Sequence, residues 1–327
     1  MTTSVDNYNI QKKVVTISLL LFAIKIIAWI ITGSVAIMTD ALESIVNVVS
    51  GFIGLYSLYL AALPKDKNHP YGHGKVEFLS AATEGVLISV AGLIIIYEAL
   101  YQLRNPQPIQ KLDYGIILTA LAGIVNYAAG LYAVKKGSAH KSPALIASGK
   151  HLQSDAYSTL GILAGLALLY FTGWAWLDSV TALVFAGIII FTGVRIVSKS
   201  VSGIMDEADE LLLNEIVDVI QTARSPNWID LHNLRIIKYG TTLHMDCHLT
   251  VPWYFNVKDA HDEIDCLEQL VRESFGESVE LFVHTDACRD FSCRLCSKTD
   301  CTVRVFSFEK QIEWTVENIS ENKRHQL

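Results

Sequence analysis

The stretch PALIASGKHLQSDAYSTLGILAGLALLYFTG, residues 143–173, decides the fold. It is long and apolar enough to cross a membrane as one helix, yet it carries His151 and Asp155 four residues apart. This spacing is about one helical turn, so both side chains share a face, where an imidazole and a carboxylate offer half of a metal site. Ionisable groups are costly in lipid and usually functional. The stretch therefore predicts a membrane protein with a metal-binding interior.

A second apolar segment, SVAIMTDALESIVNVVSGFIGLYSLYLAAL at 34–63, offers partners for that pair. Asp40, Glu43 and Asn47 fall at i, i+3 and i+7, which places them on one face of a helix. Two helices would then present oxygen and nitrogen ligands to a shared interior.

The composition divides the chain in two. Its 327 residues are 51% hydrophobic, but the apolar runs end near residue 201 and a charged, mixed sequence follows. We expect an N-terminal segment 1–13, a membrane domain 14–203, a soluble domain 206–288 and a cysteine-containing extension 289–327. A spanning helix needs about 20 apolar residues, and six candidates lie at 14–32, 34–63, 79–103, 113–135, 143–171 and 175–200.

Basic residues in the connections predict the orientation. One side has only Arg104 and Lys111, whereas the other has eleven: Lys12, Lys13, Lys65, Lys67, Lys75, Lys135, Lys136, Lys141, Lys150, Arg195 and Lys199. Both termini are therefore expected in the cytoplasm of a multi-pass protein of the cell membrane. Lys25 falls inside the first span, where it either snorkels or pairs with a carboxylate.

The loop PKDKNHPYGHGKVEF at 64–78 contains a second group of candidate metal ligands. Asp66, His69 and His73 lie among proline and glycine residues that favour turns. Histidine and aspartate converging in a turn can bind zinc or a similar ion. The alternative is that a surface loop tolerates any polar residues.

Three stretches in register with the six spans resemble the cation diffusion facilitator family: GSVAIMTDALESIVN (33–47), NHPYGHGKVEFLSA (68–81) and HLQSD (151–155). The resemblance implies a tetrahedral transport site with two ligands from the second helix and two from the fifth, and metal export coupled to proton entry. Carried over, the ligands are Glu43, Asn47, His151 and Asp155. Glu43 and Asn47 both depart from the family, which usually has Asp or His at the first position and Asp at the second. Asn47 offers only a neutral oxygen, so the site holds less negative charge than the common form. Asp40 either restores the missing charge or is a packing or capping feature.

The soluble part predicts the order helix, strand, strand, helix, strand at 210–223, 231–240, 241–252, 259–275 and 279–287. This α+β (αββαβ, ferredoxin-like) order resembles the family's cytoplasmic domain, which dimerises and binds regulatory metal. The corresponding ligands are His232, His248, His261, His284 and Asp286. For each histidine taken singly, an ordinary surface or core role is the alternative.

The run CRDFSCRLCSKTDC at 288–301 departs from the family pattern. In a reducing compartment, Cys288, Cys293, Cys296 and Cys301 are poor candidates for stable disulfides. Metal or redox use is expected, with either zinc or an iron–sulfur cluster; the alternative is a flexible tail. Cys247 and Cys266 are expected to be buried and to act as small apolar residues in the core. Residues 302–320 suggest a hairpin, and residues 321–327 suggest a disordered end.

The function expected from these features is that of a divalent transition-metal exporter (zinc, iron, cadmium or manganese class) working by metal/proton antiport. A membrane-bound metal sensor with weak or lost transport is the alternative. A membrane enzyme is disfavoured because no nucleophile or oxyanion motif is evident. The expected partners are metal cations, protons, membrane lipid and a second copy of the chain. Nucleic acid is not expected, because the net charge is −7.

Overall fold

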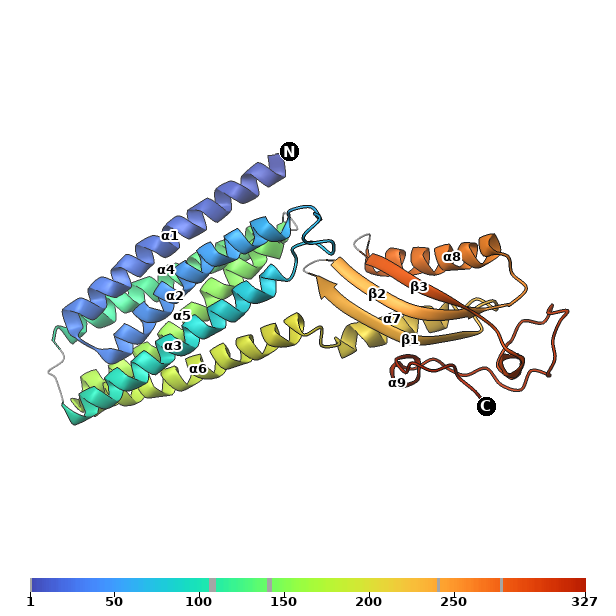
Figure 1. The fold of residues 1–327 in the computed structure, drawn as a ribbon. Coiled ribbons are helices and arrows are strands. Elements are labelled where there is room, and N and C mark those ends of the chain that lie inside the picture. Colours follow the sequence, from blue (N-terminus) through green and yellow to red (C-terminus); the bar gives the residue numbers. More distant parts are fainter. Residues whose placement is uncertain (1, 106–109, 140–142, 240–241, 277–278) are drawn as a thin grey trace. The chain divides into compact units, whose positions relative to one another are not determined.

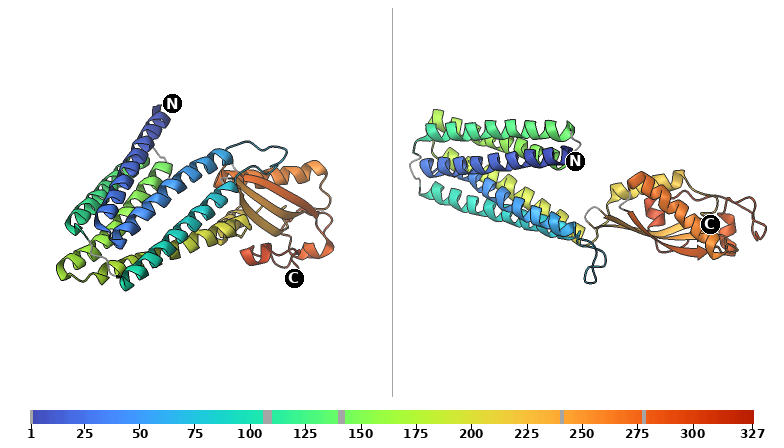
Figure 2. Two further views of the ribbon diagram at one scale, coloured as in Figure 1. Left: turned by 60° about the vertical axis from the view of Figure 1, so that its left-hand side comes forward. Right: turned by 90° about the horizontal axis from the view of Figure 1, so that it is seen from above.

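The structure, a computed structural model, describes residues 2–105, 110–139, 143–239, 242–276 and 279–327. It contains two compact units, one formed by residues 1–57 with 79–200 and the other by residues 58–78 with 201–327. Figures 1 and 2 show a bundle of helices in the first unit and a small sheet with helices in the second.

The first unit is built from helices that run alongside one another (Figure 2). In the described ranges they are α1 Thr2–Thr32, α2 Val35–Ala61, α3 Val76–Arg104, α4 Leu112–Ala139, α5 Pro143–Thr172 and α6 Trp176–Ile204. Five described stretches are long and apolar enough to cross a membrane: Val35–Ala61, Val76–Arg104, Leu112–Lys136, Gly149–Thr172 and Trp176–Ile204. In α1 the apolar stretch Thr16–Thr32 is shorter. Five of the six expected spans therefore have the required length and composition.

The start of α2 is capped by a buried carboxylate from α6. Asp178 accepts hydrogen bonds from the Ser34 hydroxyl at 2.5 Å and from the Val35 amide at 2.7 Å. These contacts satisfy amides that the first helical turn leaves without partners and place a negative charge at the positive end of the helix. The helix that carries Glu43 and Asn47 is thereby fixed to α6.

Helices α4 and α5 approach closely through glycines. A Cβ atom added to Gly149 on α5 would lie 2.7 Å from the carbonyl oxygen of Gly130 on α4. Small residues at such crossings let helix backbones come together in membrane bundles. Because Gly149 lies two residues before His151, this contact also positions the part of α5 that carries His151.

The second unit has the predicted order of elements (Figure 1). They are α7 Glu210–Thr222, β1 Asp230–Tyr239, β2 Thr242–Val251, α8 Val257–Phe275 and β3 Val279–Ala287. The sheet order is β1-β2-β3, with β1 antiparallel and β3 parallel to β2. Both helices share one apolar core with the sheet, which includes Ile216, Leu249 and Leu267. The α+β order is confirmed, whereas the ferredoxin-like likeness stays a prediction.

The C-terminal extension differs from the expectation. It contains the 3-10 helix η1 (Asp290–Arg294) and the short helix α9 (Val316–Ile319), and the described residues 302–320 contain no strand. The hairpin prediction is wrong because Trp314 and Ile319 turn into the domain core, at 3% and 0% exposure. The prediction of a disordered end is also wrong, since the amide of Asn233 on β1 donates to the Glu321 carbonyl oxygen at 2.9 Å.

The two isolated cysteines lie in different surroundings. Cys247 on β2 is buried, as predicted. Cys266 on α8 is exposed, so its prediction as a buried filler is wrong. The amphipathic pattern of α8 places Leu267 and Val271 in the core and leaves the neighbouring position at the surface.

Candidate metal sites

The first candidate site lies between α2 and α5. The Asn47 side-chain amide donates a hydrogen bond of 3.1 Å to Asp155 Oδ2. His151 Nε2 lies 4.0 Å from the same oxygen. Three residues expected from the sequence thus meet at one carboxylate oxygen, although the two helices are far apart along the chain. Asp155 is buried, whereas the His151 side chain is 53% exposed.

Glu43 belongs to the same neighbourhood. It lies four residues before Asn47 on α2 and interacts electrostatically with Asp155, Asp40 and Lys25. Helical geometry puts these two residues of α2 on one face, one turn apart. The site therefore carries two acidic groups, Glu43 and Asp155.

Asp40 has a different role. Its Oδ1 atom accepts a hydrogen bond from Lys25 Nζ at 2.8 Å and another from the Thr159 hydroxyl at 3.1 Å. Lys25 and Asp40 are both buried, with 2% exposed side chains. The negative charge of Asp40 is thus balanced within the bundle by Lys25. Of the two alternatives for Lys25, snorkelling or pairing with a carboxylate, the structure shows the pairing.

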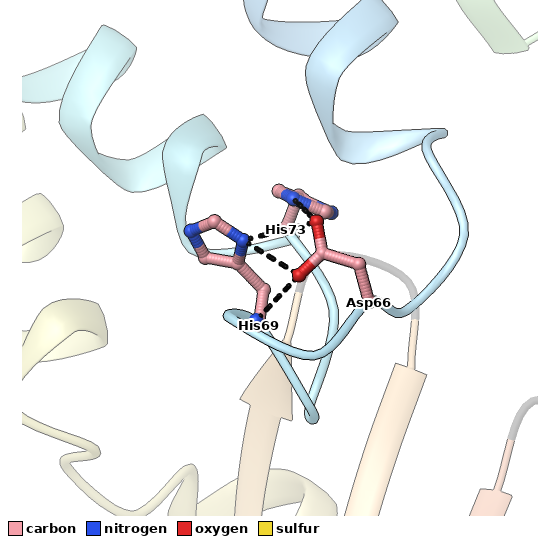
Figure 3. A group of neighbouring side chains, drawn as sticks. All are labelled: Asp66, His69 and His73. Carbon is pink, nitrogen blue, oxygen red and sulfur yellow. Dashed lines mark hydrogen bonds and ion pairs between the residues drawn. The ribbon is translucent and has the colours of Figure 1, made fainter.

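The second candidate site is the loop after α2. Donor atoms of Asp66, His69 and His73 lie within 4.8 Å of one another (Figure 3). Asp66 Oδ1 accepts the backbone amides of Asn68 at 2.8 Å and His69 at 2.7 Å, which fold the loop into a tight turn. The backbone hydrogen bond from His69 is the largest factor that lowers the pKa of the Asp66 carboxyl. The turn therefore presents an ionised carboxylate beside two imidazoles.

The third candidate site lies on the sheet. Strand register pairs His232 with His248, and His248 with His284, in one row across β1, β2 and β3. Asp286 Oδ2 lies 3.5 Å from His232 Nε2 and 3.5 Å from His248 Nδ1. The donor atoms of these three residues lie within 4.8 Å of one another. His284 is beside them, with its ring centroid 4.7 Å from that of His248.

His261 is not part of that group. It lies on α8, is exposed, and pairs with Asp265 one turn along the same helix at 3.7 Å. The described groups with clustered ligand atoms do not include it. Four of the five residues expected in this domain are therefore brought together.

Sequence reasoning missed the residues that surround the sheet site. Asp230 Oδ2 lies 3.3 Å from His232 Nδ1, and the His325 ring also pairs with Asp230. Burial raises the pKa of the Asp230 carboxyl, but hydrogen bonds from His232 and His325 outweigh it and lower the pKa to about 2. Arg324 donates to Asp286 Oδ1 at 2.5 Å. The Arg324 guanidinium is thus bonded to one oxygen of the candidate metal ligand Asp286.

The four cysteines of the extension all line one small cavity of about 20 Å³. The chain folds back between residues 288 and 301, so thiols separated along the sequence face a common space. The structure brings the whole predicted set together.

Comparison with known proteins matches both units to one family. Residues 13–205 match the model of the cation efflux transmembrane domain, and residues 208–288 match that of the cytoplasmic domain of cation efflux proteins. An uncharacterized transporter of Synechocystis sp. is 32% identical over 250 residues, which cover 76% of this chain and 81% of the relative. The cation-efflux pump FieF of Escherichia fergusonii is 30% identical over 272 residues, which cover 82% and 89% of the two chains. FieF of Shewanella oneidensis is 26% identical over 273 residues, which cover 83% and 91%. The chain is an integral membrane protein that belongs to the cation efflux, or cation diffusion facilitator, family of transporters.

Proposed function

We propose that this protein exports a divalent transition-metal cation from the cytoplasm in exchange for protons. Glu43, Asn47, His151 and Asp155 are the proposed ligands of the transported ion. The observation that carries the proposal is the convergence of Asn47 and His151 on Asp155 Oδ2, at 3.1 and 4.0 Å. The proposed assembly is a homodimer with six spans per chain. Both termini are proposed to lie in the cytoplasm, which the distribution of basic residues in the connecting loops supports.

The ligand set suits a divalent ion by charge. Two carboxylates and two neutral donors balance a double positive charge, provided that Asp40 is already neutralised by Lys25. Nitrogen and oxygen donors suit zinc, iron, cadmium and manganese to different degrees. The proposed substrate is an ion of this class.

Metal binding requires a rotation of the Asn47 side chain. Its amide nitrogen donates one hydrogen bond to Asp155, and only its carbonyl oxygen can ligate a metal. Rotation of the amide would release the Asp155 oxygen and present the Asn47 oxygen to the same space. Metal entry would thus replace one hydrogen bond with two coordination bonds.

Proton coupling follows from competition for the same groups. A metal binds only a neutral imidazole and an ionised carboxylate, so bound metal and bound protons exclude each other. Imidazole titrates near neutral pH, which puts this competition in the physiological range. Metal loading from the cytoplasm and protonation on the other side would then give antiport.

The loop and sheet sites are proposed to bind regulatory metal. The loop group is Asp66, His69 and His73, and the sheet group is His232, His248, His284 and Asp286. His261, which the resemblance also implies as a ligand, lies apart from the sheet group on α8. Both groups belong to the second unit, whereas the proposed ligands of the transported ion belong to the first. Their support is the clustering of ligand atoms within 4.8 Å for Asp66, His69 and His73 and for His232, His248 and Asp286.

A metal sensor with weak or lost transport is the second candidate. The observation that favours it is the loss of one acidic group at Asn47, which Asp40 does not restore because it is paired with Lys25. A sensor would bind metal at the sheet site without moving it across the membrane.

Metal uptake into proteoliposomes tests the proposal. Wild-type protein should load zinc into vesicles, and Asp155→Ala should abolish loading because it removes the oxygen that the other ligands contact. Asp113→Ala is the matched control, since this exposed carboxylate lies in the first turn of α4, away from the site. Absence of loading by the wild type, with metal still bound, would favour the sensor.

A further inference from the structure

Four cysteines surround one cavity at the end of the sheet. Cys288 directly follows β3, Cys293 lies in η1, and Cys296 and Cys301 come from the chain that folds back beneath them. The cavity has a volume of about 20 Å³, enough for about one water-sized body. A single ion fits this space with less rearrangement of the chain than an iron–sulfur cluster would need.

The four thiols form no disulfides and are largely withdrawn from solvent. Cys296 is buried, and the other three cysteines of the cavity are half-buried. The four side chains line one shared space, which a thiophilic cation could occupy.

The backbone around the cavity is held by hydrogen bonds. The Arg304 guanidinium donates to the carbonyl oxygens of Cys293 at 2.8 Å and Cys296 at 3.0 Å. The Trp253 amide donates to the Cys288 sulfur at 3.3 Å. Amide donors to sulfur stabilise thiolates, and groups that orient ligands in this way tune metal sites. The loop is thus fixed with its thiols facing inward.

The charge of the lining also suits a thiolate centre. Arg304 and Lys298 line the same cavity as the four cysteines. A divalent ion bound by four thiolates carries a net charge of about −2, and the Arg304 guanidinium would offset part of it. Lys298 is already paired with Asp300 at 3.0 Å, so its charge contributes less.

We propose that Cys288, Cys293, Cys296 and Cys301 bind one thiophilic divalent ion, of which zinc is the best match, as a structural centre. The four sulfurs are not among the described groups whose ligand atoms lie within 4.8 Å of one another. The sulfurs would therefore move closer together as they bind the ion. The centre would fasten the chain after residue 288 to the end of β3. This inference does not rest on transport; it uses the proposed cytoplasmic orientation only to keep the thiols reduced.

Cobalt substitution of the full-length protein in detergent is the first test. Tetrahedral cobalt bound by thiolates gives an intense charge-transfer band in the near ultraviolet, which nitrogen and oxygen sites do not give. We expect this band in the wild type, its loss in Cys296→Ser, and its full retention in Cys266→Ser, which alters an exposed cysteine on α8. Absence of the band from the wild type would overturn the proposal.

Alkylation of the wild-type protein is a second test, and its result does not depend on whether the cysteine variants fold. The protein is treated with iodoacetamide before and after a chelator, and the modified cysteines are identified by mass spectrometry. We expect the four cavity cysteines to be protected together until zinc is removed by the chelator. Iron with inorganic sulfide, a disulfide among the four, or equal alkylation before and after chelation would each overturn the single-ion centre. None of these readouts depends on metal flux.

Discussion

Lys25 and Asp40 form a buried ion pair between α1 and α2, with 2.8 Å between Nζ and Oδ1. The pair lies beside the proposed transport site, because Thr159 on α5 donates to the same Asp40 oxygen and is four residues from Asp155. The contacts of Lys25 and Thr159 with Asp40 therefore join three helices beside the proposed site.

Breaking the pair should destabilise the membrane domain. Lys25→Met would leave Asp40 buried with no compensating cation, and removal of one partner of a buried pair costs about 3–5 kcal/mol. We expect a clear fall in the thermal unfolding midpoint in detergent. The double variant Lys25→Met with Asp40→Asn should recover most of the loss, since neither charge then remains. Equal midpoints for the single variant and the wild type would contradict the assigned pairing.

Restoring acidic ligands should change the choice of metal. The double change Glu43→Asp with Asn47→Asp shortens one carboxylate and adds another beside Asp155, whose oxygen now accepts the Asn47 amide. The extra charge should shift the relative uptake of zinc, cadmium, iron and manganese into proteoliposomes. An unchanged profile would show that these two positions do not set selectivity.

The α4–α5 crossing should not tolerate a larger residue. In Gly149→Ala the new methyl group would meet the Gly130 carbonyl oxygen at 2.7 Å, and overpacking of this kind costs about 1–3 kcal/mol. We expect a lower unfolding midpoint and reduced uptake, because His151 moves with the helix. Gly187→Ala is the matched control, since a Cβ there meets nothing within 4 Å. Similar midpoints for the two variants would argue against the close crossing.

Removal of Arg324 should strengthen metal binding at the sheet. Its guanidinium occupies Asp286 Oδ1, and a charge-assisted hydrogen bond of this kind contributes about 1.5–3 kcal/mol. Arg324→Ala should therefore raise zinc affinity by roughly tenfold, measured by competition with a fluorescent chelator. Lys323→Ala is the control, because its partner is Glu321. The gain should vanish when His232→Ala is added, and persistence of the gain would place the effect at another site.

The two isolated cysteines should react at different rates. Burial, with a smaller effect from Asp246, raises the pKa of the Cys247 thiol to about 12. This thiol therefore stays protonated at neutral pH, and only the thiolate attacks alkylating reagents. Cys266 is exposed and should be labelled first at pH 7.5, followed by mass spectrometry. Both should react in urea. Equal native rates would contradict the burial of Cys247.

Local patterns in the sequence predicted the elements well. The apolar runs and the αββαβ order appear because each depends on periodicity and chain length. The histidine row on the sheet was anticipated from the family resemblance, and strand register brings its members together. These features can be predicted without knowing which residues far apart in the sequence are in contact.

Long-range contacts could not be read from the sequence. The alternation in residues 302–308 resembles a strand, but burial of Trp314 and Ile319 in the domain core decides the path of the extension. The bond of Arg324 to Asp286 and the pairing of His325 with Asp230 likewise join residues distant along the chain. Polar residues near a chain end are predicted from sequence to be exposed to solvent, because their specific partners are not known.

Metal accumulation driven by an imposed pH gradient tests the central claim most directly. Purified protein is placed in vesicles with an acidic lumen, and zinc uptake is followed with and without a protonophore. The account predicts uptake above equilibrium that collapses with the protonophore and is absent in Asp155→Ala. Zinc binding without uptake, or uptake unaffected by the gradient, would contradict proton-coupled export through the site where Asn47 and His151 meet Asp155.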